Sequence, residues 1–231
     1  MRVPIDITPA ESYMATMSRV PAFILILLLA ACAAYNVGGQ FVAGRQALLR
    51  NDLQTALGYF LAAAQSDPNY VFRAVYFHEG IWTYVGRAQY ATKRYQEARQ
   101  SLERALSMDK DDHLARLYLG LTLARTGDLS GGIKEIESAM RGIYDWLEYI
   151  NRTRPFEAYW DPSRDIRKAI EKDLDYISSK DFNPERLIAD AEWLGKRMEE
   201  EIDYVRRDER RRYEQDHDRR RGVSLGVGIG F

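Results

Sequence analysis

Apolar residues recur at spacings of three and four along most of the chain, and this period predicts amphipathic helices rather than strands. One combination of residues occurs three times within residues 37–146. A glycine is followed after 12 positions by a small residue, after four more by a large apolar residue, and after three more by alanine. The three sets are Gly44, Ala56, Phe60 and Ala63; Gly86, Ala98, Leu102 and Ala105; and Gly120, Gly132, Ile136 and Ala139.

The distance between the sets is regular. Gly86 and Gly120 lie 34 residues apart, and Gly44 and Gly86 lie 42 apart, which is 34 plus an insertion of eight. A small residue is needed where the two helices of a hairpin cross, because a larger side chain would hold the backbones apart. The large apolar residue then fills the space against the neighbouring hairpin. Three coincident spacings favour stacked hairpins over unrelated amphipathic helices.

This pattern resembles the tetratricopeptide repeat family, whose unit is a helix-turn-helix of about 34 residues. The resemblance implies an all-α fold, an α-solenoid of about three repeats over residues 37–146, and a role in binding protein or peptide partners. The eight extra residues, Val71 to His78, hold Phe72, Val75, Tyr76 and Phe77. We expect them to lengthen the first helix of the second repeat and to pack on the N-terminal repeat. The alternative is a protruding aromatic contact surface.

The resemblance also implies where a partner binds. In this family the first helix of each hairpin lines a concave groove, which places three positions per repeat toward a ligand. Two arginines beside apolar neighbours would hold an acidic residue or a free carboxylate by charge-assisted hydrogen bonds. The alternative is that these are ordinary exposed residues and that partners bind the convex face. The groove residues implied are Phe41, Arg45, Leu48, Thr83, Arg87, Tyr90, Leu117, Leu121 and Ala124.

Residues 147–205 predict a helical extension that caps the open C-terminal end of the solenoid. The aromatic-rich segment from Trp146 to Trp160 predicts a bent connector. Asp161 followed by Pro162 is a helix-start signal, for a helix that runs to about Ser179. Asn183 and Pro184 repeat the signal for a longer helix. Its predicted buried stripe is Leu187, Ala191, Leu194, Met198, Ile202 and Val205.

Residues 206–231 form a charged helix end and a Gly-rich tail. Residues 206–221 hold eight Arg against five acidic residues, which favours a solvated helix end over a cationic patch for lipid headgroups or anionic glycans. Val223, Leu225, Val227, Ile229 and Phe231 then alternate with Gly and Ser. Alternation is a strand period, so we expect the tail to add a strand to a partner's sheet or to stay disordered.

The N-terminal residues 1–31 are typical of a secretory signal peptide, with translation possible from Met14 or Met17. Arg19 precedes an apolar run that reaches only 13 residues by Ala34, and a membrane-spanning helix needs about 20. The run ends in Leu29-Ala30-Ala31-Cys32, which resembles the lipobox of bacterial lipoproteins. The resemblance implies a lipid on Cys32, a tether over residues 32–36 and, from Ala33, the outer membrane facing the periplasm. The alternative is an uncleaved anchor helix.

Composition and motifs narrow the function. Lys and Arg total 33 against 34 Asp and Glu, a net charge of −1, so nucleic acid is not an expected partner. His78, His113 and His217 form no pair with metal-ligand spacing, and no phosphate loop or hydrolase elbow is present. We therefore expect no cofactor and no catalysis. The sequence predicts a membrane-tethered adaptor for envelope proteins, or alternatively a constitutive subunit of a large envelope complex, and leaves the oligomeric state open.

Overall fold

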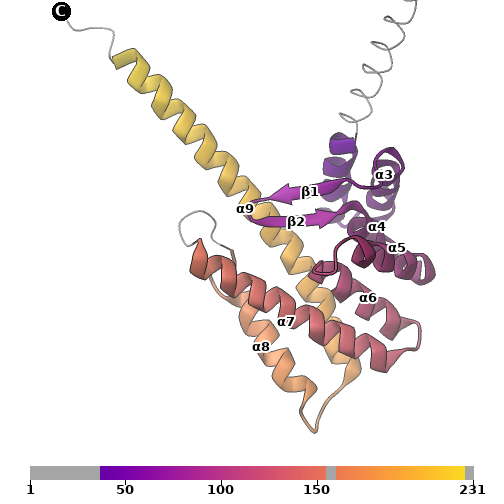
Figure 1. Ribbon diagram of the computed structural model, residues 1–231. Helices are drawn as coiled ribbons and strands as arrows, with labels where there is room; N and C mark the ends of the chain where they lie inside the picture. The colour runs from indigo at the N-terminus through magenta and orange to yellow at the C-terminus, as the bar shows by residue number, and fades with distance from the viewer. Residues whose placement is uncertain (1–36, 155–159, 227–231) are drawn as a thin grey trace, which may run out of the picture.

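The computed structural model describes residues 37–154 and 160–226, with side chains placed up to residue 218. This part of the chain is helical apart from one small sheet (Figure 1). In chain order the elements are an unlabelled helix over residues 37–49, α3 (Leu53–Ser66), β1 (Val71–Ala74), β2 (Phe77–Gly80), α4 (Ile81–Ala91), α5 (Tyr95–Met108), α6 (His113–Arg125), α7 (Leu129–Thr153), α8 (Asp165–Ile177) and α9 (Pro184–Gly226).

Helices 37–49 and α3, α4 and α5, and α6 and α7 form three stacked hairpins, here called repeats one to three (Figure 1). The glycines sit at the crossings, as predicted. A Cβ atom on Gly86 would lie 2.5 Å from Leu102 Cγ, and one on Gly120 would lie 2.8 Å from the carbonyl oxygen of Gly132. Only glycine permits these approaches. The all-α solenoid predicted from the spacing is therefore confirmed.

Each hairpin turns through a residue with positive φ, a position that sequence reasoning did not single out. Asn51, Lys93 and Gly127 have φ values of 61°, 62° and 102°. Each stands seven residues after its crossing glycine, so the turn recurs with the repeat. A left-handed residue at this point ends a helix and reverses the chain. The repeat is thus specified by its turn as well as by its crossing.

The insertion in repeat two is a β-hairpin, so the prediction of a lengthened helix is wrong. β1 and β2 pair antiparallel with Phe72 opposite Glu79 and Arg73 opposite His78. Phe72 and Glu79 are buried whereas Arg73 and His78 are exposed, which is the alternation of a strand. Aromatic and β-branched residues favour strands, and over eight residues their apolar positions fit either period. The expected packing on repeat one does occur, through Phe72 against Phe41.

The chain beyond repeat three also departs from the prediction. α7 continues to Thr153, so no bend occurs at Trp146, and residues 155–159 of the expected connector lie outside the described residues. α8 begins at Asp165 rather than after Asp161. Asp161 nevertheless caps this helix, because its carboxylate accepts hydrogen bonds from the backbone N–H groups of Ile166 and Arg167. The capping signal was correct, but Pro162 occupies a turn and not the first helical position.

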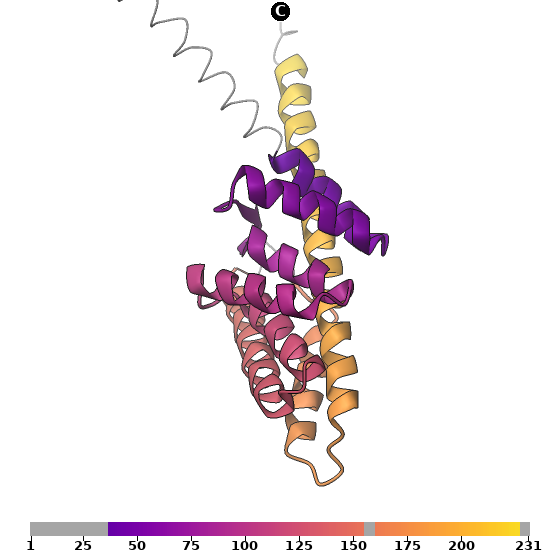
Figure 2. The same cartoon turned by 90° about the vertical axis from the view of Figure 1, so that its right-hand side faces the viewer.

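α8 packs on α7 at the C-terminal end of the solenoid, which is the place predicted for a cap. α9 does not stay there. It turns back, runs past the repeats toward the N-terminal end, and projects beyond the body, as Figures 1 and 2 both show. It remains helical through Gly226, so the strand expected from Val223 does not begin there, and residues 227–231 lie outside the described residues.

Candidate protein-binding groove

The first helices of the three repeats, 37–49, α4 and α6, share one side of the solenoid, and α9 lies along it (Figure 2). The predicted stripe of α9 is the face it buries: all six side chains are 4 % exposed or less. Gly195 permits a close approach to α6, since a Cβ atom there would lie 2.5 Å from the Tyr118 hydroxyl oxygen. The groove that the resemblance assigns to a partner is therefore filled by the chain's own helix.

Glu199 anchors α9 to two repeats at once. Its Oε1 lies 2.5 Å from Arg45 Nη2, and its Oε2 lies 3.0 Å from Arg87 Nη2. Arg45 belongs to repeat one and Arg87 to repeat two. All three side chains are 3 % exposed or less, so water does not screen the pairs. The two arginines predicted to bind a partner's carboxylate pair here with a carboxylate of this chain.

Glu79 from β2 completes the cluster. Its carboxylate lies 3.2 Å from Arg87 Nη1 and is fully buried. Burial raises the pKa of Glu79 from 4.5 to about 8, although the Arg87 charge opposes the shift. Burial works against the charged form of Arg87, but the charges of Glu79 and Glu199 outweigh it and raise the Arg87 pKa. The hairpin insertion thus adds Glu79 to the buried cluster of Arg45, Arg87 and Glu199.

A second anchor lies one heptad earlier on α9. The Tyr90 hydroxyl donates a hydrogen bond of 2.5 Å to Glu192, and Arg125 Nη2 lies 3.1 Å from the same carboxylate. Burial, together with the hydrogen bond to Glu192, raises the pKa of Tyr90. Arg125 also pairs with Glu185 at 3.1 Å, near the start of α9. Repeats two and three are therefore both attached to α9 through acidic residues.

The other predicted groove residues are buried or half-buried. Phe41 packs edge-on against Tyr84 with ring centres 4.7 Å apart. The Thr83 hydroxyl donates to Asp112 at 2.5 Å. Leu117 and Leu121 are 0 % exposed, and Leu48 and Ala124 are half-buried. None of the nine predicted residues is an exposed side chain in this structure. Their contact with a separate partner remains a prediction.

Sequence reasoning missed the acidic residues of α9 that meet the groove. Glu192 and Glu199 are seven residues apart and directly follow Ala191 and Met198 of the buried stripe. That position beside an apolar face was a usable signal for carboxylates that turn inward. Glu79 gave no such signal, because its segment was assigned to a helix.

Metal centres and membrane-spanning helices are not found in the described part of the chain. There, no group of three or more His, Cys, Asp or Glu side chains is placed to hold a metal ion. No helix within residues 37–154 and 160–226 combines the length and the apolar character that crossing a bilayer requires. Cys32, the predicted lipidation site, lies outside the described residues.

Comparison with known proteins supports the repeat assignment. The tetratricopeptide repeat family model matches residues 86–144, which run from Gly86 in α4 into α7. The match therefore covers most of repeats two and three, and repeat one shows the same crossing of Gly44 on Phe60. The curated proteins gave no match to this chain. Tetratricopeptide repeats are protein-interaction modules, which makes a scaffold role the family-level expectation.

Proposed function

We propose that the protein is a non-catalytic scaffold, fixed by a lipid on Cys32 to the periplasmic face of a bacterial outer membrane, that holds protein partners. The observation that carries the scaffold role is the tetratricopeptide match over residues 86–144 on stacked helix hairpins. Repeat arrays of this kind present extended surfaces for other proteins.

The membrane attachment is supported by the sequence around the sole cysteine. Cys32 ends an apolar run and follows two alanines, and it precedes Val37, the first described residue, by five positions. Five residues span at most about 18 Å, so a lipid on Cys32 would hold repeat one close to the membrane surface. Each buried methylene of a lipid chain contributes about 0.8 kcal/mol, and two or more chains give stable attachment.

The filled groove bears on how partners bind. Each fully buried Leu, Ile, Val or Met side chain of α9 contributes about 1.5–3 kcal/mol to stability. A peptide that displaced the whole stripe would have to make up the sum of these contributions. We therefore place partner binding on surfaces that α9 leaves open. The same observation favours the alternative, a constitutive subunit of a large envelope complex, because a groove closed by its own helix offers no vacancy to exchanging peptides.

Lipidation is tested by labelling cells with radioactive palmitate and fractionating their membranes. We expect the wild-type chain to take up label and to sediment with the outer membrane. Cys32→Ser should take up none and appear in the soluble fraction. A wild-type chain without label, or a Cys32→Ser chain that still sediments with membrane, would contradict the tether.

The scaffold role is tested by purifying the tagged full chain from detergent-solubilised envelopes before and after a high-salt wash. Companions that leave with salt would support an exchanging adaptor. A stoichiometric companion that resists salt would support the constitutive subunit. Recovery of the chain alone, under conditions where a known envelope complex survives, would overturn both.

A further inference from the structure

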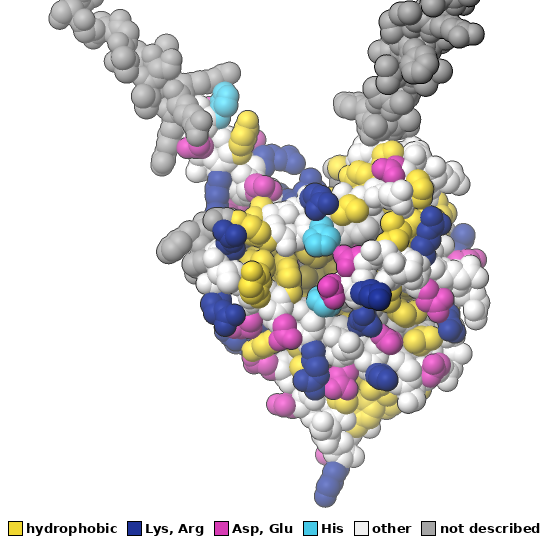
Figure 3. All heavy atoms as spheres, viewed as in Figure 1, with side chains coloured by type: hydrophobic (Ala, Val, Ile, Leu, Met, Phe, Trp, Pro, Cys, Tyr) yellow, Lys and Arg dark blue, Asp and Glu magenta, His cyan; other side chains and the backbone are white. Residues whose placement is uncertain are grey.

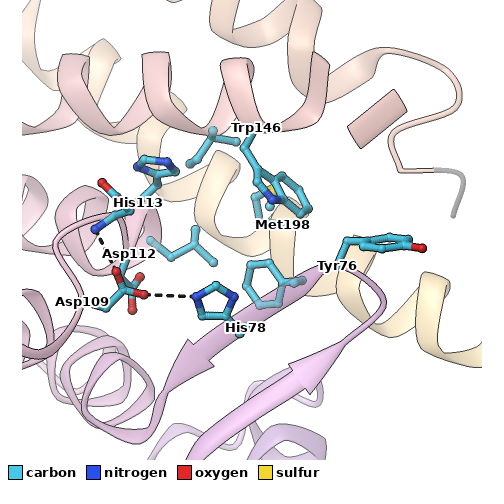
Figure 4. A pocket seen from close by; sticks show the side chains of 11 residues that line it. Tyr76, His78, Asp109, Asp112, His113, Trp146 and Met198 are labelled. Atoms are coloured by element: carbon cyan, nitrogen blue, oxygen red, sulfur yellow. Dashed lines mark hydrogen bonds and ion pairs between the residues drawn. The ribbon is translucent and has the colours of Figure 1, made fainter. Parts of the chain in front are cut away.

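A pocket of about 140 Å³ opens on the surface of the molecule. Figure 3 shows it as a hollow with hydrophobic walls beside histidine and acidic side chains. Four parts of the fold meet there: the β-hairpin at Phe77 and His78, the turn between α5 and α6, α7 at Trp146, and α9 at Met198 (Figure 4). His78 and His113, far apart in sequence, face the same space.

The inner walls are apolar and fixed. Leu114, Ile143 and Met198 are each 2 % exposed or less, so they cannot turn outward without opening the core. Phe77 and Trp146 meet edge-to-face with ring centres 5.8 Å apart. A volume of 140 Å³ is close to that of an engineered cavity, of about 150 Å³, that holds benzene. An alkyl chain of four or five carbons has a comparable size.

The mouth of the pocket is acidic. Asp109 is 40 % exposed and its Oδ2 lies 3.2 Å from His78 Nε2, and Asp111 beside it is exposed. Burial lowers the pKa of His113 and Arg116 adds to the shift, although the charges of Asp111, Asp109 and Asp145 oppose it. No Lys or Arg belongs to the described residues that line the pocket. A ligand therefore meets carboxylates where it leaves the apolar walls.

The N-terminal end of α6 also faces the pocket, and a helix N-terminus by itself favours an anion. Here that preference is already satisfied, because the Asp112 carboxylate accepts the Ala115 N–H at 2.8 Å. Asp112 is buried and also accepts the Thr83 hydroxyl, so it does not add an open charge to the mouth. The exposed carboxylates that line the mouth are those of Asp109 and Asp111.

We propose that this pocket binds a basic side chain of a partner protein, with its methylene stem on Phe77 and Trp146 and its cation between Asp109 and Asp111. An anion would be repelled at the mouth, and a neutral alkyl group would gain nothing there. That the side chain comes from a protein rests on the proposed scaffold function. The pocket's preference for an alkyl cation does not.

The preference is tested on the full chain in detergent by following the Trp146 indole N–H signal in NMR titrations. The probes are n-butylammonium, n-butanol and butyrate, which share a four-carbon stem. We expect butylammonium to shift the signal with a dissociation constant in the millimolar range, and butyrate to leave it unmoved. Butanol should bind about fivefold more weakly than butylammonium, as expected for loss of exposed ion pairs.

Two matched double variants distinguish the effect of the aspartates at the pocket mouth from the effect of the protein's overall charge. Asp109→Asn/Asp111→Asn should weaken butylammonium binding by about fivefold without weakening butanol binding. The control, Asp175→Asn/Asp181→Asn, removes the same charge from two exposed residues at the α8–α9 end and should change neither. Equal binding of the three probes, no response of Trp146, or an unchanged Asp109→Asn/Asp111→Asn variant would overturn the proposal.

The protein source is tested separately by placing a photo-crosslinking residue at Tyr76, on the exposed tip of the hairpin beside the pocket. Cross-links in native envelopes that fall beside a Lys or Arg of another protein, and that disappear in Asp109→Asn/Asp111→Asn, support the proposal. Probe binding combined with cross-links that ignore the two aspartates would keep the cation preference and overturn the partner side chain. Failure of the scaffold role would instead show as the absence of any captured protein.

Discussion

Glu199 lies 2.5 Å from the Arg45 guanidinium although the two residues are 154 positions apart in the sequence. The pair joins α9, the last helix of the described chain, to the first repeat through one buried contact. Arg87 binds the other carboxylate oxygen of Glu199. α9 is thereby integrated into the solenoid rather than appended to it.

Removing the shared carboxylate should be strongly destabilising. Glu199→Ala leaves Arg45 and Arg87 buried with one partner fewer, and breaking a buried pair typically lowers the free energy of unfolding by about 3–5 kcal/mol. The neighbouring Glu200 is exposed, so Glu200→Ala should change the free energy of unfolding by less than about 0.5 kcal/mol. Urea unfolding followed by circular dichroism measures both. Equal stability of the two variants would show that the cluster does not hold α9.

The crossing glycines were predictable because their requirement is local and steric. A repeated spacing of 12 and four residues is enough to identify the place where Gly86 meets Leu102. The place of α9 was not predictable in the same way. Its stripe shows that a face is buried but not against which surface, since apolar burial has no direction of its own.

The groove arginines illustrate the same limit. Arg45 and Arg87 indicated a partner's carboxylate, whereas in this structure they pair with Glu199; a single sequence does not say which of the two they meet. The β-hairpin was missed for a different reason. Phe72, Val75 and Tyr76 satisfy a helical spacing over eight residues, and a segment so short does not separate the two periods.

Two glycine substitutions should act in opposite directions. Gly86→Ala places a Cβ atom against Leu102, and overpacking of this kind lowers the free energy of unfolding by about 1–3 kcal/mol. Gly58 lies within α3 with open space around it, so Gly58→Ala should raise the free energy of unfolding by up to about 1 kcal/mol. Thermal unfolding of the two variants is the measurement. A stabilising Gly86→Ala would contradict the close crossing.

The buried Glu79 should make stability depend on pH. Its pKa rises from 4.5 in a solvated chain to about 8 in the folded protein because of burial. A raised carboxyl pKa means that the folded state binds the proton more tightly, so this contribution is complete below pH 4.5 and is lost as the pH rises through about 8.

We therefore expect the free energy of unfolding to be lower at pH 9 than at pH 6, and the difference to shrink in Glu79→Gln, which stays neutral at both values. Urea titrations at the two pH values measure the difference. An identical difference in the wild type and in Glu79→Gln would assign the dependence to other groups.

Two carboxylates, Asp173 on α8 and Asp190 on α9, should also weaken the fold above the pKa of Asp173. Burial raises the pKa of Asp173 from 3.8 to about 6, and the charge of Asp190 adds to the shift. At pH 7.5 Asp173 is charged beside Asp190, so Asp190→Asn should raise the free energy of unfolding by about 1 kcal/mol. At pH 5 the gain should be smaller, because Asp173 is then protonated. The control is Asp175→Asn, which changes an exposed residue on α8, the helix of Asp173. No gain at pH 7.5 would contradict the repulsion.

A closed groove requires α9 to lie along the first helices of the repeats in solution. Spin labels at Gln46 and Glu200, exposed neighbours of Arg45 and Glu199, report this through double electron–electron resonance in a Cys32→Ser background. We predict one short, narrow distance distribution that broadens and lengthens when Glu199→Ala is added. A broad, long distribution in the chain with Glu199 intact would show that the groove is open and that partners are free to occupy it.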